Sequence, residues 1–434
     1  MQKNNTQSFE FSKKIKLNFE GGEISSDAGL LVVHEFCEKF GVQKLLKNLL
    51  PENRNKIVIH DKPEILYQEI IRIIGGYQSN NFAKYLQNDP TFKNIHEKIA
   101  SSSTCCRLEK EFSIKDLKQL QKLQNKLLDQ AYELEKPKEV FLDLDTTYDP
   151  ASGKIEGSTY NTHYGETGYS PLFCTDGKTG DIIKAHLRPG NTACSKKVVP
   201  FIKPLLKRYR SLNIIVKSRM DSGFAAPEIY DLYEKNANTY YYIKLKKNAV
   251  LDKKVNDILE KHKIEQTKKK EIFTDIKYKT KKSWQKERRV LLHIHLDEDK
   301  LIPDYAAIVT NDEEIIPEDG IKFYRGRSRI EKHIEESKNG FSSDHLSHKS
   351  FVSNMVKFQL FILAQLIINI FRRLTFPEKE STFSIASIRI FILKIGAKVI
   401  INSRNLVFKC SSCFPYAKLF LTILKNIQTL PRFG

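Results

Sequence analysis

Cysteine, tryptophan and methionine are scarce in this sequence. Its 434 residues include seven cysteines, three methionines and one tryptophan. An odd number of scattered cysteines, behind a polar segment from Met1 to Phe11, argues against a secreted domain held by disulfides, and we expect a reducing, cytoplasmic environment. Cys410 and Cys413 form a single CxxC pair without a second pair or nearby histidines, so no four-ligand zinc site is expected there.

Long uninterrupted apolar runs and internal repeats are also missing. The most apolar stretch, Phe358 to Phe371, is interrupted by Gln359, Gln365 and Asn369, which favours a buried core helix over a membrane span. No self-similarity appears at the periods of solenoid repeats. We therefore expect a globular protein of two or three domains that has no membrane partner.

Acidic residues are outnumbered by basic ones. The chain has 72 Lys and Arg against 52 Asp and Glu, a formal net charge of +20 and a pI of about 9.4. The segment from Ser347 to Gly434 alone has thirteen basic and two acidic residues, and a second basic run lies between Lys244 and Arg289. Such blocks are typical of phosphate-contacting faces and indicate a polyanionic partner, although a solvated lysine-rich surface would have the same composition.

The N-terminal region, residues 1–137, is predicted to be mostly helical. Helices are expected at Leu30–Leu50, Pro63–Ile74, Asn81–Leu86 and Ile114–Glu135. Short helices ahead of a basic catalytic region fit a helix-turn-helix module that binds DNA ends, and they fit a helical scaffold equally well.

Residues 138–246 alternate between strand and helix patterns, which predicts an α/β fold with helices on the faces of a mixed sheet. The predicted strands are Glu139–Asp145, Tyr169–Cys174, Asp181–Leu187, Asn213–Met220 and Thr239–Leu245, and the predicted helices are Ser195–Tyr209 and Glu228–Lys235.

The remaining chain is predicted to form three further regions. Residues 247–320 are expected to be a β-rich basic insertion, with strands near Val290–Leu296 and Tyr305–Thr310. Residues 321–375 should contain two helices that complete the core. Residues 376–434 should be a basic helical region in which Ile385–Ile401 is one long helix.

Acidic residues stand at the ends of two predicted strands. Asp143 and Asp145 lie two apart, so their side chains project from the same face of a strand. Asp221 follows the strand Asn213–Met220, where catalytic side chains commonly emerge in α/β sheets. Each sequence also suits an ordinary strand-end turn, so neither is decisive alone.

Tyr324, Arg327, Glu331 and Lys338 have the spacing of one helical face. Their offsets of three, four and seven place them within roughly a 60° arc at about 100° per residue. A neighbouring apolar stripe that begins at Ile330 would bury the other side. The alternative is a solvated helix with paired charges at i and i+4.

Three carboxylates brought together repel one another, which destabilises them unless a cation is present. Mg²⁺ prefers hard oxygen ligands and keeps waters and substrate phosphates in its other positions. Two such ions, about 3.5–4 Å apart, activate an attacking water or hydroxyl and stabilise the leaving oxygen in phosphodiester cleavage. The combination of Asp145 or Asp143 with Asp221 and Glu331 therefore indicates a metal-dependent enzyme that acts on nucleic acid.

These motifs together resemble a known family. Tyr324, Arg327, Glu331 and Lys338 match at every spacing the Tyr-x2-Arg-x3-Glu-x6-Lys signature of bacterial insertion-sequence transposases of the Asp-Asp-Glu type. From about Gly21 to Leu374 the chain resembles the insertion-sequence-1380 family in particular, in the segments Phe141–Thr147, Tyr160–Asn161, Tyr164–Gly165, Leu187–Asn191 and Arg219–Phe224.

The resemblance implies an RNase H-like core interrupted by the β-rich insertion. It implies that Asp145, Asp221 and Glu331 are the catalytic residues and the ligands of two Mg²⁺ ions, for which Mn²⁺ could substitute. Asp145 is preferred because related motifs place a threonine two residues after the aspartate, as Thr147 is here. Asp143 remains a rival.

The resemblance also implies residues that contact DNA. Tyr324, Arg327 and Lys338 would hold phosphates of the transposon end, arginine as a planar fork and lysine as a point charge. Trp284, within the basic insertion, would stack on a flipped base. The alternative for Trp284, a strand residue that covers local core, is favoured at any single position. Arg219 would orient Asp221, contact DNA or form a structural salt bridge.

The predicted function is a DNA transposase that catalyses cut-and-paste transposition. It would bind terminal inverted repeats, cut there, and join the freed 3′ hydroxyl to target DNA, working as at least a dimer on double-stranded DNA near the bacterial nucleoid. The alternatives are an RNase H-like nuclease without strand transfer and a repeat-binding relic that cannot cut. The intact set of three carboxylates argues against the relic.

Overall fold

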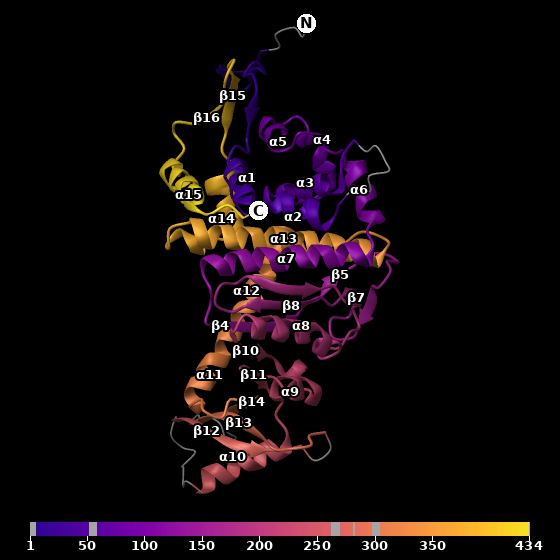
Figure 1. Cartoon of the computed structure of the whole chain (residues 1–434), viewed down its shortest axis with the longest axis vertical. Helices are drawn as coiled ribbons and strands as arrows, with labels where there is room; N and C mark the ends of the chain where they lie inside the picture. The colour runs from indigo at the N-terminus through magenta and orange to yellow at the C-terminus, as the bar shows by residue number, and fades with distance from the viewer. Residues whose placement is uncertain (1–5, 52–58, 262–269, 281–282, 297–303, 434) are drawn as a thin grey trace. The chain divides into compact units, whose positions relative to one another are not determined.

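The computed structural model describes every residue except 1–5, 52–58, 262–269, 281–282, 297–303 and 434. The chain forms two compact units, each assembled from separate stretches of sequence (Figure 1). The helical unit comprises Met1–Gln130, Glu336–Ser343 and Val352–Gly434. The sheet unit comprises Ala131–Glu335 and Asp344–Phe351.

An eight-stranded sheet, in the order β12-β13-β14-β11-β10-β4-β8-β9, is the frame of the sheet unit. Strands β4, β10 and β11 are parallel, whereas β8 and β9 continue the sheet antiparallel on the other side of β4. The predicted mixed α/β architecture is therefore confirmed. These five strands are β4 (Glu139–Thr146), β8 (Leu172–Asp176), β9 (Ile182–His186), β10 (Ile215–Met220) and β11 (Thr239–Lys244).

Alternation along β4 explains why this strand lies at the centre. Val140, Leu142 and Leu144 are fully buried, and strand geometry sends the residues between them to the opposite face. Two helices connect the parallel strands: α8 (Val198–Ser211) contacts β10, and α9 (Pro227–Glu234) contacts β11. A proline at the first position of α9 suits a helix start, because the missing N–H has no partner there.

The β-rich insertion is not a separate layer but an extension of the same sheet. Its strands β12 (Lys270–Tyr278), β13 (Arg288–Leu296) and β14 (Asp304–Thr310) are antiparallel, and β14 pairs with β11 of the core. The strands predicted near Val290 and Tyr305 are present. Helix α10 (Ala249–Lys261), which precedes them, was not predicted.

Three short strands form a small sheet beside the start of the core. Its order is β5-β7-β6, made of β5 (Asp149–Pro150), β6 (Thr159–Asn161) and β7 (Glu166–Tyr169). The turn between β6 and β7 includes Gly165, whose φ of 71° is a conformation that glycine adopts without a Cβ penalty.

The segment that contains the signature residues is helical but not one α-helix. It consists of α11 (Pro317–Arg325), a 3₁₀ turn (Gly326–Ser328), α12 (Arg329–Glu335) and a π turn (Glu336–Gly340). The expectation of a single uniform helix from Tyr324 to Lys338 was therefore wrong. Because the winding changes twice, the 100° spacing does not by itself place Lys338 on the face of the other three residues.

The helical unit contains most of the helices predicted near the N-terminus. The expected helix Leu30–Leu50 is divided at Gly41, which has a φ of 58°. The helices are α1 (Leu30–Lys39), α2 (Val42–Leu49), α3 (Lys62–Ile74), α4 (Ala83–Leu86), α5 (Pro90–Ile95), α6 (Ser102–Glu111), α7 (Ile114–Leu134), α13 (Phe351–Thr375), α14 (Ile385–Ile388) and α15 (Ala417–Thr429). Both α7 and α13 cross the boundary between the two units.

The two ends of the chain share a small sheet in the helical unit. The strand β15 (Ala397–Ile401) pairs with β16 (Leu406–Cys410) and with β3 (Ile24–Ser25), while β1 (Gln7–Phe9) and β2 (Ser12–Leu17) form a hairpin. The long helix predicted at Ile385–Ile401 is correct only as far as Leu393, through α14 and a π turn (Arg389–Leu393), because the segment ends in the strand β15. Buried Ala397 and Val399 alternate with exposed Lys398, which is the period of a strand.

Helix α13 is long and apolar enough to cross a membrane by length and composition alone. In the structure, 83% of its most apolar window is buried inside the protein. That burial is typical of a core helix, the interpretation favoured by its interrupting Gln359, Gln365 and Asn369, all of which are buried.

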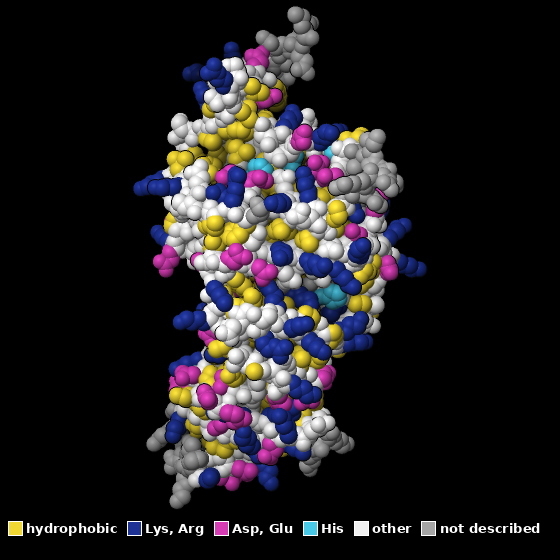
Figure 2. Space-filling model, viewed as in Figure 1, with side chains coloured by type: hydrophobic (Ala, Val, Ile, Leu, Met, Phe, Trp, Pro, Cys, Tyr) yellow, Lys and Arg dark blue, Asp and Glu magenta, His cyan; other side chains and the backbone are white. Residues whose placement is uncertain are grey.

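Basic side chains are spread over the surface. Figure 2 shows Lys and Arg across the visible face of each unit, with acidic side chains among them. The basic run between Lys244 and Arg289 includes residues 262–269 and 281–282, which lie outside the described residues. On the face shown, charge alone does not mark one DNA-binding patch.

Candidate active site

Asp145 and Asp221 leave the sheet side by side. The parallel pairing of β4 with β10 ends at Leu144 opposite Met220, and the next residue on each strand is one of these aspartates. The Asp145 Oδ1 accepts a hydrogen bond from the Thr146 N–H at 2.8 Å, and the Asp221 Oδ1 accepts one from the Gly223 N–H at 2.8 Å. Both carboxylates are therefore held by their own following backbone at the carboxyl end of the sheet.

Arg327 connects the strand end to the signature helix. Its Nη1 lies 3.0 Å from the Asp145 Oδ2, and its Nη2 lies 3.2 Å from the Glu331 Oε1. The Glu331 side chain is 63% exposed, whereas those of Asp145 and Arg327 are mostly buried. Arg327, predicted to hold a phosphate, thus pairs with two of the predicted catalytic carboxylates.

The pKa values of Asp145 and Tyr324 are raised, in part because negatively charged carboxylates lie close to them. Burial raises the pKa of Asp145, and nearby Asp221 raises it further, while Arg327 acts in the opposite direction. Burial, together with Asp221 and Asp145, raises the pKa of Tyr324 to about 12 against the pull of Arg327. The Tyr324 phenol is therefore protonated near neutral pH and available as a hydrogen-bond donor.

Asp143 has a different environment from Asp145, although the two side chains share a strand face. Asp143 is fully buried and accepts two hydrogen bonds from Arg219, at 2.6 Å from Nε and 2.7 Å from Nη2. Burial raises the pKa of Asp143 to about 6, despite Arg219, so the carboxylate is ionised at neutral pH. Arg219 forms a structural salt bridge, and Asp145 is the aspartate that faces Arg327.

Arg219 also fixes the start of the signature segment. Its Nη1 donates to the Phe323 carbonyl at 2.8 Å, one residue before Tyr324. Two glycines make room for this guanidinium: a Cβ on Gly177 would lie 2.2 Å from Nη2, and a Cβ on Gly326 would lie 2.3 Å from Nη1. The buried pair thus places α11, and with it Tyr324 and Arg327, beside β4 and β10.

A family model supplies the identity that this geometry suggests. Residues 7–432, nearly the whole chain, match the model described as transposase DDE domain group 1. The chain belongs to this transposase family. A search of curated proteins finds no match. Among solved structures, the cryo-EM structure of piggyBac transposase in a synaptic complex with hairpin DNA is similar at 11% identity and a TM-score of 0.43, covering 94% of this chain and 83% of that chain.

The other two predicted DNA contacts have different surroundings. Lys338 lies in the π turn Glu336–Gly340, a segment of the helical unit. Trp284 is only 6% exposed; its ring packs edge-on against Tyr230 and Tyr278, and Arg288 lies over it. In this structure the indole covers local core, as the alternative interpretation held, and base stacking would require that packing to open.

Two side chains near Asp145 and Asp221, Tyr164 and Cys194, were not assigned by sequence reasoning. Tyr164 is 49% exposed and stacks on Tyr148 with ring centroids 4.7 Å apart. Burial raises the pKa of Tyr164, and the charges of nearby Asp145, Cys194 and Asp221 raise it further. The Cys194 Sγ lies 3.4 Å from the Thr146 Oγ1. The only sequence signal was the family-like pair Tyr164-Gly165, to which no role was attached.

Transposases with DDE domains generally use divalent metal ions. In the described part of the chain, no three His, Cys, Asp or Glu side chains are grouped closely enough to hold one. The donor chemistry nevertheless fits, because Asp145, Asp221 and Glu331 offer hard carboxylate oxygens. Asp145 and Asp221 are close enough to repel, and Arg327 supplies the neutralising charge in this arrangement.

Proposed function

We propose that this transposase cuts DNA at the terminal inverted repeats of its own element and joins the freed ends to target DNA. Asp145, Asp221 and Glu331 are the proposed catalytic residues and would hold two Mg²⁺ ions. The observation that carries the proposal is the exit of Asp145 and Asp221 from adjacent paired strands, with Arg327 linking Asp145 to Glu331.

The strand order supports an RNase H-like core for this chemistry. The five strands β9-β8-β4-β10-β11 combine an antiparallel half with a parallel half, and the central strand β4 carries the first aspartate. Carboxyl ends of strands at the point where the order reverses are the usual site for ligands in open α/β sheets.

Each protein group has a defined task in the proposed reaction. Cleavage breaks the P–O3′ bond as a water oxygen bonds to phosphorus, which leaves a 3′ hydroxyl; strand transfer repeats this in-line exchange with that hydroxyl as the attacking group. When bound, divalent ions would activate the attacking oxygen and neutralise the leaving one. Arg327 can exchange its carboxylate partners for a phosphate, which its planar fork also fits. Tyr324 keeps its proton and can donate it in a hydrogen bond.

The proposal also covers the oligomeric state, the DNA partner and the cellular location. Two transposon ends must be held together, so we propose a homodimer on double-stranded DNA. We also propose that it works in the bacterial cytoplasm, on the nucleoid. The basic balance of 72 Lys and Arg to 52 Asp and Glu supports a polyanionic partner.

End cleavage with a matched control tests the function. A DNA fragment that carries the inverted repeats is incubated with the wild-type protein, Glu331→Ala or Glu335→Ala, with Mg²⁺, Mn²⁺ or EDTA. Glu335 is exposed on the same helix, one turn further on, and is predicted to play no part. We expect metal-dependent cuts at the repeat ends that disappear only in Glu331→Ala.

Other results would identify the alternatives. Mg²⁺-dependent cuts unrelated to the repeats, with no joined product, would indicate a nuclease without strand transfer. Tight repeat binding with no cut under any metal would indicate the binding relic. Loss of cutting in both glutamate variants would remove Glu331 from the catalytic set.

A further inference from the structure

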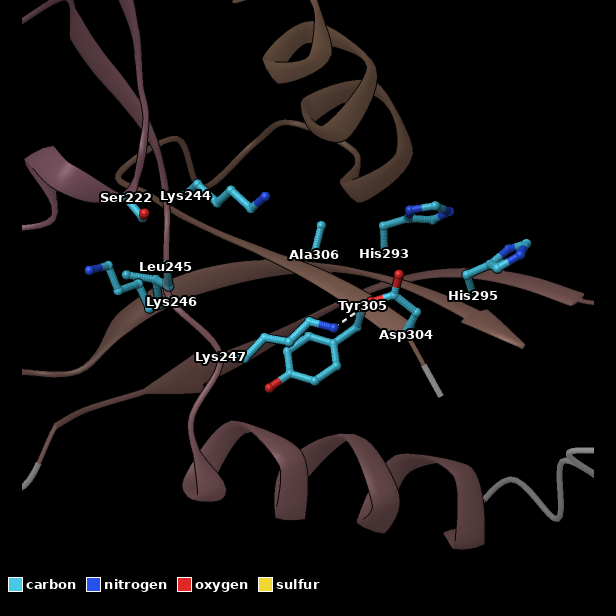
Figure 3. Close-up of a pocket in the computed structure, with 10 residues that line it drawn as sticks. All are labelled: Ser222, Lys244, Leu245, Lys246, Lys247, His293, His295, Asp304, Tyr305 and Ala306. Carbon is cyan, nitrogen blue, oxygen red and sulfur yellow. Dashed lines mark hydrogen bonds and ion pairs between the residues drawn. The ribbon is translucent and has the colours of Figure 1, made fainter. Parts of the chain in front are cut away.

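A cavity of about 550 Å³ opens on the sheet unit next to the proposed catalytic residues. Ser222, which directly follows Asp221, lines one side. Lys244, the last residue of β11, and Lys246 and Lys247, which follow it, line another side. Strands β13 and β14 form the rest of the wall (Figure 3). We call this cavity the lysine groove. Its volume is within the usual range for ligand pockets.

Two of the three lysines are not neutralised. Lys247 pairs with Asp304 and lies over the Tyr305 ring, so its charge and that of Asp304 cancel. Lys244 and Lys246 are exposed, and neither has an acidic partner at salt-bridge distance within the part of the chain that is described. Figure 3 shows Lys244 extending toward His293 and Lys246 pointing to the opposite side, so the two charges are spread along the groove.

The groove continues to the signature segment through His293. The exposed Arg325, next to Tyr324, donates to the His293 Nδ1 at 3.1 Å. Since Nδ1 accepts this bond, a neutral ring keeps its proton on Nε2, which lies 3.5 Å from the Glu271 Oε2. Burial and Arg325 both lower the pKa of His293, so the neutral ring is the form near neutral pH. The wall thus combines lysine and arginine charge with a neutral histidine whose Nε2 faces Glu271.

We propose that the lysine groove holds the phosphodiester backbone of a single DNA strand that continues past the bond cut at Asp145 and Asp221. This inference rests on the proposed function. The cations lie along a path from Ser222 to Arg325 rather than around one point, which suits successive phosphates better than one small anion. A duplex has two backbones, whereas the groove offers one path of cations, so one strand is the fitting form.

Single-strand binding in EDTA tests the groove without requiring cleavage. Fluorescence anisotropy with a labelled oligothymidine would compare the wild type with Lys244→Ala/Lys246→Ala. The matched control is Lys203→Ala/Lys207→Ala, which removes two exposed charges from α8. We expect the groove variant to bind about tenfold more weakly and its salt slope to fall by about 1.4, because each single-strand phosphate contact contributes about 0.7. The control should stay within about twofold of the wild type.

Equal weakening in both double variants would overturn the proposal, because it would show a general charge effect. No weakening in the groove variant would overturn it as well. Full displacement of the oligonucleotide by millimolar inorganic phosphate would indicate an isolated anion site and not a strand groove.

A second measurement links the groove to the cut. End cleavage would be measured on one substrate that keeps the flanking strand beyond the cut and on another that lacks it. The wild type should cut the truncated substrate more slowly, whereas the groove variant should cut both equally. A truncation effect of the same size in both proteins would overturn the inference. If the wild type cuts neither substrate, the proposed function fails, and the anisotropy result still decides whether the groove binds single strands.

Discussion

Asp143 and Asp145 lie two residues apart on β4, and each pairs with an arginine. The two pairs differ in burial and in hydrogen bonding. Asp143 and Arg219 are buried, with two short hydrogen bonds between them, and the arginine continues to the Phe323 carbonyl. Asp145 and Arg327 make one contact at 3.0 Å, and the arginine is shared with the largely exposed Glu331. The buried pair holds helix to sheet, and the shared pair can exchange partners. An aspartate paired with an arginine is structural in the buried pair and has a proposed catalytic role in the shared pair.

The largest expected effect is on end cleavage, which should depend on Asp145. Asp145→Asn should lower end cleavage by about 10³-fold or more, because it removes a proposed metal ligand. Its free energy of unfolding should change by no more than about 1 kcal/mol, since the mutation also removes charge crowded against Asp221. Gel-based cleavage and urea unfolding measure the two quantities. A folded Asp145→Asn protein that cuts normally would move the first catalytic position to Asp143.

The free energy of unfolding should depend mainly on the Asp143–Arg219 pair. Arg219→Met should lower the free energy of unfolding by about 3–5 kcal/mol, because it leaves the Asp143 carboxylate buried without its partner. Urea unfolding, with Arg327→Met as the matched arginine variant, gives the comparison. Similar losses in both variants would mean that the two pairs are structural to the same degree.

The pH dependence of stability should come from the buried aspartate. Since the folded pKa of Asp143 is about 6, above its unfolded value, the folded state binds the proton more tightly. Its contribution is greatest below about pH 4 and is lost as pH rises through about 6, by up to about 3 kcal/mol. Urea unfolding between pH 4 and pH 7 should show this decline in the wild type and a flatter curve in Asp143→Asn. Parallel curves would show that Asp143 does not titrate in this range.

The smallest effect is expected at Gly326, which lies against Arg219 and directly precedes Arg327. Gly326→Ala places a Cβ 2.3 Å from the Arg219 Nη1, so either the guanidinium or the 3₁₀ turn must move, at a cost of about 1–3 kcal/mol. Thermal unfolding measures that cost. Because Arg327 is the next residue, cleavage should also fall, and Gly396→Ala, at a site with open space and no positive φ, controls for a general glycine effect. An unchanged melting temperature would show that the turn adapts without strain.

Local patterns predicted most of the sheet unit correctly. Alternation around Glu139–Asp145 gave the strand β4, because a strand with one buried face repeats every two residues, and the run Asn213–Met220 gave β10. Periodicity failed in the last part of Ile385–Ile401, where the strand β15 follows a helical stretch that is just as rich in isoleucine. It also failed to show that β14 joins β11, since strand pairing between distant segments leaves no local signal.

The sequence by itself determined the residue types and spacings of the chemistry: two aspartates after strands and the Tyr324, Arg327, Glu331 signature that indicates a transposase. Only the tertiary structure decided which aspartate is buried and which arginine each one contacts. Asp143 and Asp145 share a strand face, so no periodic rule distinguishes them. They are distinguished by what packs above that face: Arg219 from β10 fills the space over Asp143, and Arg327 from the signature segment reaches Asp145.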